Sequence, residues 1–243
     1  MQKVLEQLKD DSNYYGDYGK QFLSNSDIQA LLLNPKDFGK SRPDNANFAK
    51  GRLFHQLILE PEKADEWQFV DVSSRVTKAY KEFIAENNLD FALLTKEGEE
   101  IRNLTETMLS NFDFYDAIRH PECEYEVPAV AEIEGLMWKG KADIVHPDML
   151  IDIKTTGKIS DFKWSARKYN YDSQCYIYQE LFGKPLVFYV IDKETGMLGI
   201  FRPTEEFVKG GKDKVKRAVE VYNKFFGDNP TDSIDSYYID EYL

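Results

Sequence analysis

The sequence contains little histidine and cysteine, with three histidines and two cysteines among 243 residues. Cys123 and Cys175 lack the spacing of a metal or redox motif, so we expect two reduced thiols and no disulfide. No apolar run approaches the roughly 20 residues that span a membrane. The polar stretch at residues 1–10 also lacks the apolar core of a signal peptide. These absences argue against a membrane protein or a disulfide scaffold, and they predict a cytoplasmic protein.

Positive charge is also scarce, because 31 lysines and arginines stand against 43 acidic residues, for a formal net charge of -12. Such a chain should not bind polyanions indiscriminately, since affinity for phosphate comes from lysine and arginine. The charge is uneven along the chain. Basic residues outnumber acidic ones from Lys139 to Lys168, whereas residues 228–243 carry acidic side chains and no basic ones. A local phosphate-binding site is therefore compatible with the acidic composition.

Apolar residues make up 42% of the chain and aromatic residues 14%, enough to bury a large core. No repeat or low-complexity segment divides the sequence. We predict one domain over residues 1–227, with a helical part at 1–120 and a part at 121–227 that contains the sheet. Residues 228–243 are expected to form an acidic tail.

Helix signals dominate the first half of the chain. We predict one helix that begins at a capping box of Ser26 and Gln29 and ends before an Asn-Pro pair. A second predicted helix contains the sequence GRLFHQLIL and places His55 one turn after Gly51. Two further helices are expected at residues 76–87 and 96–110.

From Tyr125 the pattern changes to strands. Three apolar or alternating stretches, separated by glycine, proline or aspartate, predict a three-stranded meander. A helical stretch at residues 160–182, interrupted near Asn170, precedes two more strands around a turn at 193–196. A last amphipathic helix stops at Gly227. The expected architecture is a five-stranded mixed sheet covered by helices, of the α/β or α+β class.

The second and third of these strands carry three charges in the sequence KADIVHPDMLIDIKTT, from Lys141 to Thr156. A turn at Pro-Asp that pairs the strands symmetrically places Asp143 directly opposite Asp152 on one face of the sheet. Opposed side chains have Cβ atoms about 4.5 to 5.5 Å apart, where like charges repel. Because side chains alternate along a strand, Lys154 shares the face of Asp152, and the flanking isoleucines point into the core.

Two facing carboxylates are tolerated when they share a proton or bind a cation. Few oxygen ligands with open water positions favour Mg²⁺ used with a phosphate substrate. Lys154 would then contact a phosphate oxygen, or orient or deprotonate water. Alternatively, each acid taken alone is an exposed residue at a strand end. A glycosidase acid/base pair is a further alternative, but it leaves Lys154 unexplained.

These residues resemble the PD-(D/E)xK nuclease superfamily, with Asp143 and Asp152 at the two acidic positions and Lys154 at the lysine. Ala142 replaces the usual proline before the first acid. Gln174 and Tyr178 match the Q-x-x-x-Y motif of the RecB-type branch, whose upstream histidine is similar to His55. Taken alone, His55 could be a core histidine, and Gln174 and Tyr178 could be ordinary helix neighbours. The resemblance implies that His55, both aspartates and the carbonyl group of Ile153 bind the metal.

The fullest likeness is to the exonuclease VIII (RecE-like) branch, which includes phage-encoded relatives. It implies a restriction-endonuclease-like central mixed β-sheet flanked by helices, with a helical N-terminal portion. It also implies Mg²⁺, with Mn²⁺ as a substitute, and digestion of linear double-stranded DNA from 5′ to 3′. The product would be a 3′ single strand for a single-strand annealing protein, made by an enzyme that forms homo-oligomers in the host cytoplasm. Rival interpretations are a RecB-type nuclease for single-stranded or flap DNA, and a non-catalytic DNA-binding relative.

Other basic, hydroxyl and aromatic side chains are candidates for DNA contact. The aromatic residues Trp164, Tyr169, Tyr171 and Tyr176 are interpreted mostly as core rather than as stacking platforms. The basic residues of the last helix, at 209–217, are either a solvated face or a contact for the DNA backbone. The predicted DNA contacts are Arg52, Lys139, Lys141, Thr155, Thr156, Lys158 and Tyr171.

Overall fold

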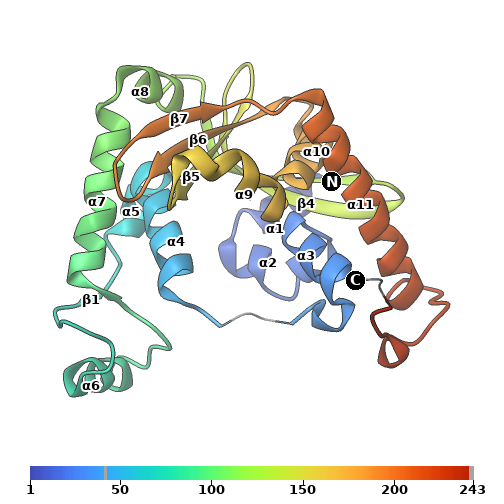
Figure 1. The fold of residues 1–243 in the computed structure, drawn as a ribbon, viewed down its shortest axis with the longest axis horizontal. Helices are drawn as coiled ribbons and strands as arrows, with labels where there is room; N and C mark the ends of the chain where they lie inside the picture. Colours follow the sequence, from blue (N-terminus) through green and yellow to red (C-terminus); the bar gives the residue numbers. More distant parts are fainter. Residues whose placement is uncertain (41–42, 241–243) are drawn as a thin grey trace.

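The computed structural model describes residues 1–40 and 43–240, and a five-stranded sheet forms its centre (Figure 1). The strands lie side by side in the order β3-β4-β5-β6-β7. Their bounds are β3 Glu124–Ile133, β4 Leu136–Val145, β5 Leu150–Thr156, β6 Leu186–Asp192 and β7 Leu198–Phe201. A separate small sheet pairs β1 Phe69–Val70 with β2 Leu93–Leu94 in parallel.

The directions of the strands make the central sheet mixed. Strands β3, β4 and β5 form an antiparallel meander, β5 and β6 are parallel, and β6 and β7 are antiparallel. Parallel neighbours need a long crossover, and here two helices, α9 Phe162–Lys168 and α10 Tyr171–Phe182, supply it. The predicted five-stranded mixed sheet is therefore confirmed.

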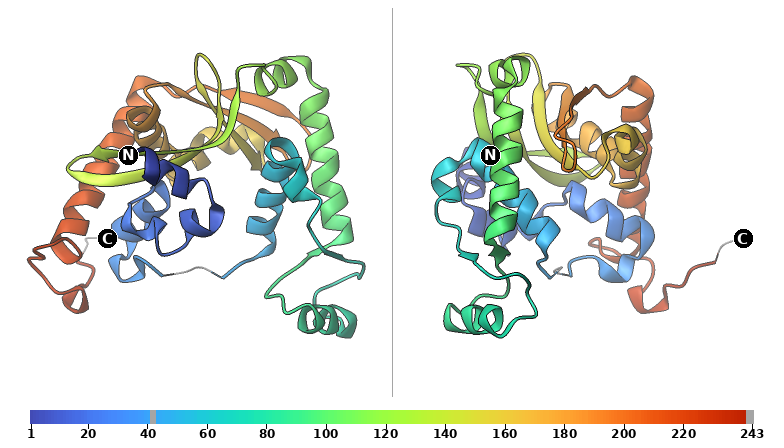
Figure 2. Two further views of the ribbon diagram at one scale, coloured as in Figure 1. Left: turned by 180° about the vertical axis from the view of Figure 1, so that it is seen from behind. Right: turned by 60° about the vertical axis from the view of Figure 1, so that its left-hand side comes forward.

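Helices make up most of the first half of the chain and cover the sheet. In Figures 1 and 2, α7 and α11 stand at opposite ends of the molecule. The early helices are α1 Gln2–Leu8, α2 Asp11–Tyr15, η1 Gly19–Gln21, α3 Asn25–Leu33, η2 Pro35–Asp37, α4 Ala46–Leu59, α5 Pro61–Ala64, α6 Lys78–Glu86, α7 Thr95–Ser110 and α8 Phe112–Ile118. The later ones are η3 Ile159–Asp161, α11 Glu205–Phe225 and η4 Ile234–Ser236.

The alternation of side chains along β5 divides its residues between two cores. Ile151 and Ile153 pack in the core that contains residues of α4, α7 and α8. Leu150 packs in the core that contains residues of α9 and α10. Since neighbouring side chains point to opposite faces, Asp152 and Lys154 lie on the α9–α10 face. The sequence pattern of β5 thus places the charges of Asp152 and Lys154 on one face of the sheet.

The first residues of the chain cover one side of the β3–β4 hairpin. Leu8 and Tyr14 form a small core with Val130 of β3, and Met137 of β4 packs against it. Figure 2 shows this N-terminal segment beside the hairpin. Leu23 also pairs with β4, because its N–H donates to the carbonyl oxygen of Met137 over 3.0 Å. The N-terminal segment is therefore a fixed part of the fold.

The N-cap of helix α3 lies two residues before the predicted one. Ser24, rather than Ser26, is the N-cap, and its capping-box partner is Asp27 rather than Gln29. The N–H and the hydroxyl group of Ser24 each donate to Asp27 Oδ2 over 2.8 Å. A carboxylate near a helix N-terminus also interacts favourably with the helix dipole. This interaction favours Asp27 over the neutral amide of Gln29.

The predicted interruption near Asn170 is confirmed. Asn170 adopts the left-handed conformation with φ 59° and separates α9 from α10. The ammonium group of Lys214 on α11 bonds this junction, donating to the carbonyl oxygen of Arg167 over 2.8 Å and to Asn170 Oδ1 over 2.9 Å. It also pairs with the buried Asp172 at 2.9 Å. The orientation of α9 is thus fixed by a residue from the last helix.

Helix α11 ends at Phe225, two residues before the predicted stop. The following segment packs back on this helix, since the rings of Phe225 and Tyr237 meet edge to face at 5.9 Å. Lys224 pairs with Asp232 at 3.2 Å. Among residues 1–40 and 43–240, no helix is long and apolar enough to cross a membrane.

Gly211 is expected to be required for the contact between α10 and α11. A Cβ atom at this position would lie 1.9 Å from the carbonyl oxygen of Asp172, an impossible approach to backbone. We expect Gly211→Ala to lower the free energy of unfolding by about 3 kcal/mol, the upper end for overpacking. Urea denaturation followed by circular dichroism measures the effect.

The matched control for Gly211 is Gly51→Ala on helix α4. A Cβ atom at Gly51 meets no heavy atom within 4 Å. Alanine is favoured over glycine in helices by roughly 0.5–1 kcal/mol, so this variant should be at least as stable as the parent. Equal stabilities of the two variants would contradict the tight packing of α11 on α10.

Candidate active site

A cleft of about 790 Å³ opens where β4 and β5 meet helices α2, α3 and α4. It lies on the face of the sheet to which Asp152 and Lys154 point. The residues predicted to be catalytic or metal-binding through their side chains all line it. They are His55, Asp143, Asp152, Lys154, Gln174 and Tyr178.

The predicted register of the β4–β5 hairpin is confirmed near the turn and wrong at the acids. Ile144 pairs with Ile151, but the ladder does not continue to Asp143 and Asp152. Instead the Asp143 carboxylate accepts a hydrogen bond from the backbone N–H of Ile153 over 2.8 Å. The Asp143 carboxylate thus replaces a backbone hydrogen-bond partner of Ile153 in the β4–β5 ladder. The strands separate at the position where two carboxylates would otherwise repel.

His55 and Asp143 form the first charged pair of the cleft. His55 Nε2 lies 3.0 Å from Asp143 Oδ2, and its Nδ1 lies 2.8 Å from the carbonyl oxygen of Gly51. Burial lowers the pKa of His55, but the charge of Asp143 outweighs it and raises that pKa to about 9. Burial likewise raises the pKa of Asp143, yet His55 and Lys154 hold it below the ordinary value. Without a metal both groups are therefore charged at neutral pH, and His55 would have to lose its proton to bind one.

Asp152 and Lys154 form the second pair, deeper in the protein. Asp152 is 2% exposed, and Lys154 Nζ lies 2.5 Å from its Oδ2 atom. This contact is an ion pair without hydrogen-bond geometry, so Oδ2 has no hydrogen-bond partner among the described residues. Burial raises the pKa of Asp152 even though Lys154 opposes the shift. For Lys154 burial lowers the pKa, and the Asp152 charge reverses that shift and raises it.

Helix α10 contributes Gln174 and Tyr178, which bond strands β5 and β4. Gln174 Nε2 donates to Asp152 Oδ1 over 2.6 Å. The hydroxyl group of Tyr178 donates to the carbonyl oxygen of Lys141 over 2.9 Å. Their spacing of four residues places both side chains on one helical face. The two residues therefore connect α10 to β5 and to β4.

The donors present fit a hard divalent cation. Carboxylates and a backbone carbonyl with room for water are the oxygen ligands that suit Mg²⁺ or Mn²⁺, and the imidazole of His55 would add a softer ligand. The buried Oδ2 atom of Asp152 has the ion pair with Lys154 but no hydrogen bond among the described residues, so a cation could share this oxygen. Within the described ranges, no group of three or more His, Cys, Asp or Glu side chains forms a ready-made cage. The donors instead neutralise one another in pairs.

Three of the predicted DNA contacts are held by other protein groups. Arg52 pairs with Asp44. The ammonium group of Lys139 donates to the carbonyl oxygen of Tyr14, and that of Lys141 pairs with Asp11. Lys139 and Lys141 are both buried. Lys139 and Lys141 therefore lie in the wall of the cleft, and their ammonium groups bind the N-terminal segment.

The other predicted contacts lie around the end of β5. Thr155 and Thr156 are half-buried, and Lys158 is exposed beside Asp161 at 3.5 Å. The Tyr171 ring lies 5.2 Å from Lys154 Nζ, measured to the ring centroid. None of these four residues is among those that line the cleft, and of the four only Tyr171 has a recorded contact with Lys154.

The interpretation of the aromatic residues as core is wrong for two of them. Trp164 is 70% exposed and Tyr169 is 58% exposed, whereas Tyr176 is buried. Tyr171 is half-buried and packs on Phe162 and Phe188. Helix α9 is too short to bury more than the side chains of one stripe, and Phe162 occupies it. The helix consequently presents its tryptophan to solvent.

Glu126 is a cleft residue that sequence reasoning missed. It lies opposite Asp143 in the β3–β4 register, at the position where that ladder is interrupted. Its φ is 50°, a conformation that non-glycine residues rarely adopt. Burial, together with the charge of Asp143, raises the pKa of Glu126 to about 8. Glu126 is part of the alternating sequence of β3, but only the pairing of β3 with β4 shows that it lies opposite Asp143.

The N-terminal wall of the cleft was also missed. Asp11, Tyr14 and Tyr15 line the cleft although they lie far from the other site residues in sequence. Asp11 pairs with both Lys141 and Lys63. No motif marks these residues, since the contact depends on how the first two helices fold back over β4.

Comparisons with known proteins bear on the family and on the fold. The chain matches the model of a family described as a PDDEXK-like domain of unknown function (DUF3799) over residues 22–230. A crystal structure named "Putative exonuclease", from Eubacterium rectale, is similar with a TM-score of 0.63 and 18% identity, covering 88% of this chain and 86% of that chain. The structure of SSO0001 gives a TM-score of 0.34 and 15% identity, covering 81% of this chain and 84% of that one. No curated protein gives a significant match.

The family match and the structural likeness identify the fold. The mixed sheet flanked by helices is the restriction-endonuclease-like arrangement. The family match spans all the predicted catalytic and metal-binding residues, from His55 to Tyr178. The chain therefore belongs to the family of PDDEXK-like domains (DUF3799).

Proposed function

We propose that this protein is an Mg²⁺-dependent exodeoxyribonuclease of the RecB type, closest to the RecE-like branch. The observation that supports it best is the convergence of Asp143, Asp152 and Lys154 with His55 and Gln174 in one cleft. The family and the exonuclease-named structural neighbour support a nuclease in general. The substrate, linear double-stranded DNA degraded from 5′ to 3′, rests on the sequence resemblance.

The residues of the cleft have separable roles in phosphodiester hydrolysis. Asp143, Asp152, His55 and the carbonyl group of Ile153 would hold the metal. Once bound, a divalent cation would neutralise charge on the phosphate and lower the pKa of the attacking water molecule. Manganese is proposed as a substitute, because its ligand preferences resemble those of magnesium.

Lys154 has the geometry of a group that acts on the phosphate or on the nucleophile. Its ammonium group lies next to the metal-binding Asp152 and in the wall of the cleft. Three N–H donors on a flexible stem suit a phosphate oxygen or an attacking water. Water then attacks phosphorus while the bond to the leaving sugar oxygen breaks, and a fixed positive charge stabilises the charge that develops.

Gln174 and Tyr178 act as positioning residues. Gln174 holds one oxygen of Asp152, so the other oxygen is left for the metal or for Lys154. Tyr178 holds the backbone of β4 two residues before Asp143. The two contacts fix the separation of the strands that carry the acids.

The function is tested with linear duplexes labelled at one 5′ or one 3′ end. In Mg²⁺, the 5′ label is expected to leave as a mononucleotide at the start, while the 3′-labelled strand shortens slowly from its other end. EDTA should stop the reaction and Mn²⁺ should restore it. Early release of the 3′ label would contradict the polarity. Faster digestion of single-stranded or flap DNA would establish the rival RecB-type activity.

Binding without cleavage would identify a non-catalytic DNA-binding relative. The same assay distinguishes it, because such a protein shifts the duplex on a gel in Mg²⁺ and leaves its length unchanged. A single-strand annealing protein is the proposed partner that receives the 3′ strand. A homo-oligomer on the duplex is proposed as well, and sedimentation of the free protein measures it.

A further inference from the structure

The outer face of helix α9 combines cations with exposed aromatic rings. Within seven consecutive residues it has three basic side chains, two aromatic ones and no acid. All five are exposed. We call this surface the α9 platform, and it consists of Lys163, Trp164, Arg167, Lys168 and Tyr169.

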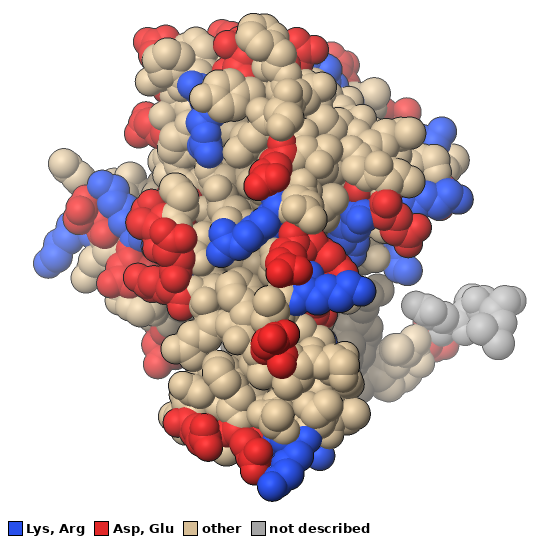
Figure 3. Space-filling model, turned by 90° about the vertical axis from the view of Figure 1, so that its left-hand side faces the viewer, with Lys and Arg blue, Asp and Glu red and all other residues tan. Residues whose placement is uncertain are grey.

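The cations of the α9 platform are not neutralised by the protein. Within residues 1–40 and 43–240, no ion pair involves Lys163, Arg167 or Lys168. By contrast, most cations near the cleft have an acidic partner, such as Lys141 with Asp11. On the face that carries α7, basic side chains are scattered among acidic ones (Figure 3). In a chain with a net charge of -12, an uncompensated group of cations indicates an anionic ligand.

A line of aromatic rings connects the α9 platform to the catalytic lysine. The Tyr171 ring lies 5.2 Å from Lys154 Nζ. The Tyr169 and Tyr171 rings have centroids 6.1 Å apart. On the helix itself, Lys163 Nζ lies 5.0 Å from the centroid of the Trp164 ring. The surface therefore continues from the reacting end of the cleft onto α9.

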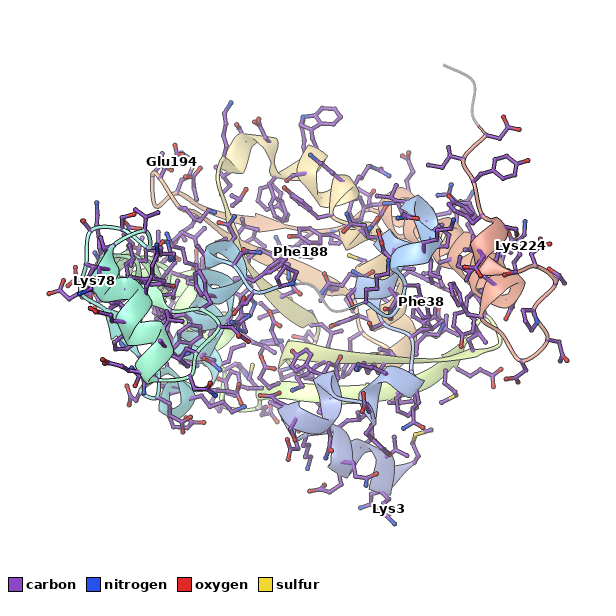
Figure 4. All side chains as sticks on the ribbon, turned by 90° about the horizontal axis from the view of Figure 1, so that it is seen from below. Lys3, Phe38, Lys78, Phe188, Glu194 and Lys224 are labelled. Atoms are coloured by element: carbon purple, nitrogen blue, oxygen red, sulfur yellow. The ribbon has the colours of Figure 1, made fainter. Side chains whose placement is uncertain are left out.

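A cavity of about 290 Å³ adjoins the α9 platform. Trp164 and Phe207 form apolar parts of its wall, and Arg167 and Arg202 supply charge. The guanidinium group of Arg167 lies 5.1 Å from the centroid of the Phe207 ring. Figure 4 shows the α9 segment at the margin of the molecule, outward of the labelled Phe188. Flat apolar walls beside cations suit a ligand that has aromatic bases and phosphates.

We propose that the α9 platform binds single-stranded DNA, with bases stacked on Trp164 and Tyr169 and phosphates next to Lys163, Arg167 and Lys168. The inference rests on the proposed function and adds the path of one strand. A duplex hides the faces of its bases, so exposed rings serve a strand that is already separated. Because Lys214 fixes the α9–α10 junction, the platform holds this strand at a constant distance from Lys154.

The test measures binding of a labelled oligothymidylate by fluorescence anisotropy, with Ca²⁺ in place of Mg²⁺. Trp164→Ala with Tyr169→Ala should weaken binding at least about tenfold, since each stacked base contributes strongly. Trp164→Phe should restore most of the affinity. The control is Tyr115→Ala on α8, at an exposed tyrosine of 51% accessibility, which should leave binding unchanged.

The cations are tested through the salt dependence of the same binding. Changing Lys163, Arg167 and Lys168 to glutamine should reduce the slope of log K against log salt by about 2, because each phosphate contact on a single strand contributes roughly 0.7. An unchanged slope, or equal affinity of the aromatic double variant and the parent, would overturn the proposal. If the platform variants kept their affinity for oligothymidylate and lost affinity for an acidic peptide that the parent binds, the surface would be assigned to a protein partner instead.

A small chromogenic phosphodiester separates this inference from the proposed function. Bis(p-nitrophenyl) phosphate is too short to reach α9, so its Mn²⁺-dependent hydrolysis should be equal in the parent and in the platform variants. Failure of the parent to hydrolyse this ester or DNA would end the proposed activity and leave the binding result intact. Lower ester hydrolysis in the platform variants would show that the substitutions disturb the metal site, and would overturn the assignment of α9 to strand binding.

Discussion

Replacing Lys154 by methionine is expected to slow digestion of duplex DNA by about 10³-fold, the cost of removing a charge-stabilising donor from an active site. Methionine keeps an unbranched stem of similar shape and removes the ammonium group. Binding of Mn²⁺ should be retained, because Lys154 is not among the metal ligands. Isothermal titration with Mn²⁺ and a gel assay of end-labelled duplex measure the two effects separately.

The stability of this variant gives a second measurement. Without the ammonium group, the buried Asp152 carboxylate loses its ion-pair partner. Removing one partner of a buried pair costs about 3 kcal/mol, so the metal-free variant should melt below the parent. Saturating Mn²⁺ should then raise its melting temperature by more than that of the parent. Lys78→Met, at a side chain that is 89% exposed, is the control and should match the parent in every assay.

Two outcomes would contradict the proposed role of Lys154. A Lys154→Met protein that digests duplex as fast as the parent would remove the lysine from the mechanism. If instead it lost cleavage and Mn²⁺ binding together, the lysine would be a structural support for the metal site.

Asp152→Asn is expected to weaken Mn²⁺ binding by at least about 100-fold and to abolish cleavage at ordinary Mg²⁺ concentrations. The substitution keeps the volume of the side chain and removes the charge that draws a cation. It also leaves Lys154 buried without its partner, which adds to the repulsion of a metal. Isothermal titration and the duplex assay again supply the measurements.

A buried aspartate elsewhere in the sheet is the matched control for this variant. Asp192 at the end of β6 is also buried, and its carboxylate accepts backbone N–H groups of Ile159 and Glu194. Asp192→Asn should lower stability and leave Mn²⁺ affinity near that of the parent. Equal losses of metal affinity in the two variants would mean that unfolding, rather than ligand loss, accounts for the result.

Much of the fold follows from the alternation of side chains and the length of one turn. The pattern Ile-Asp-Ile-Lys requires opposite faces for the isoleucines and the charges, and both cores respect it. The short turn before Met149 sets the pairing of Ile144 with Ile151. These features are local, so the sequence was sufficient to predict them.

The approach of the two acids was not predictable in the same way. Regular pairing predicts that Asp143 faces Asp152, but the carboxylate of Asp143 bonds the N–H of Ile153 and ends the ladder. That choice depends on repulsion between the acids and on His55 from a distant helix. A periodic sequence pattern predicts regular backbone pairing and does not show where a side chain replaces a backbone partner.

The surface positions of charged and aromatic residues were the least predictable. Lys139 and Lys141 suggested DNA contacts, yet a segment about 130 residues earlier covers them, as the bond from Lys141 to Asp11 shows. Trp164 suggested core because of its size, yet α9 buries a different stripe. Exposure depends on which distant segments pack on an element, and a single sequence does not encode this in a periodic pattern.

The family match begins at residue 22, whereas the wall formed by Asp11, Tyr14 and Tyr15 precedes it. The residues proposed to react and this wall thus come from different stretches of the chain. Changes in residues 11–15 would therefore reshape the wall of the cleft while leaving the residues proposed to react in place.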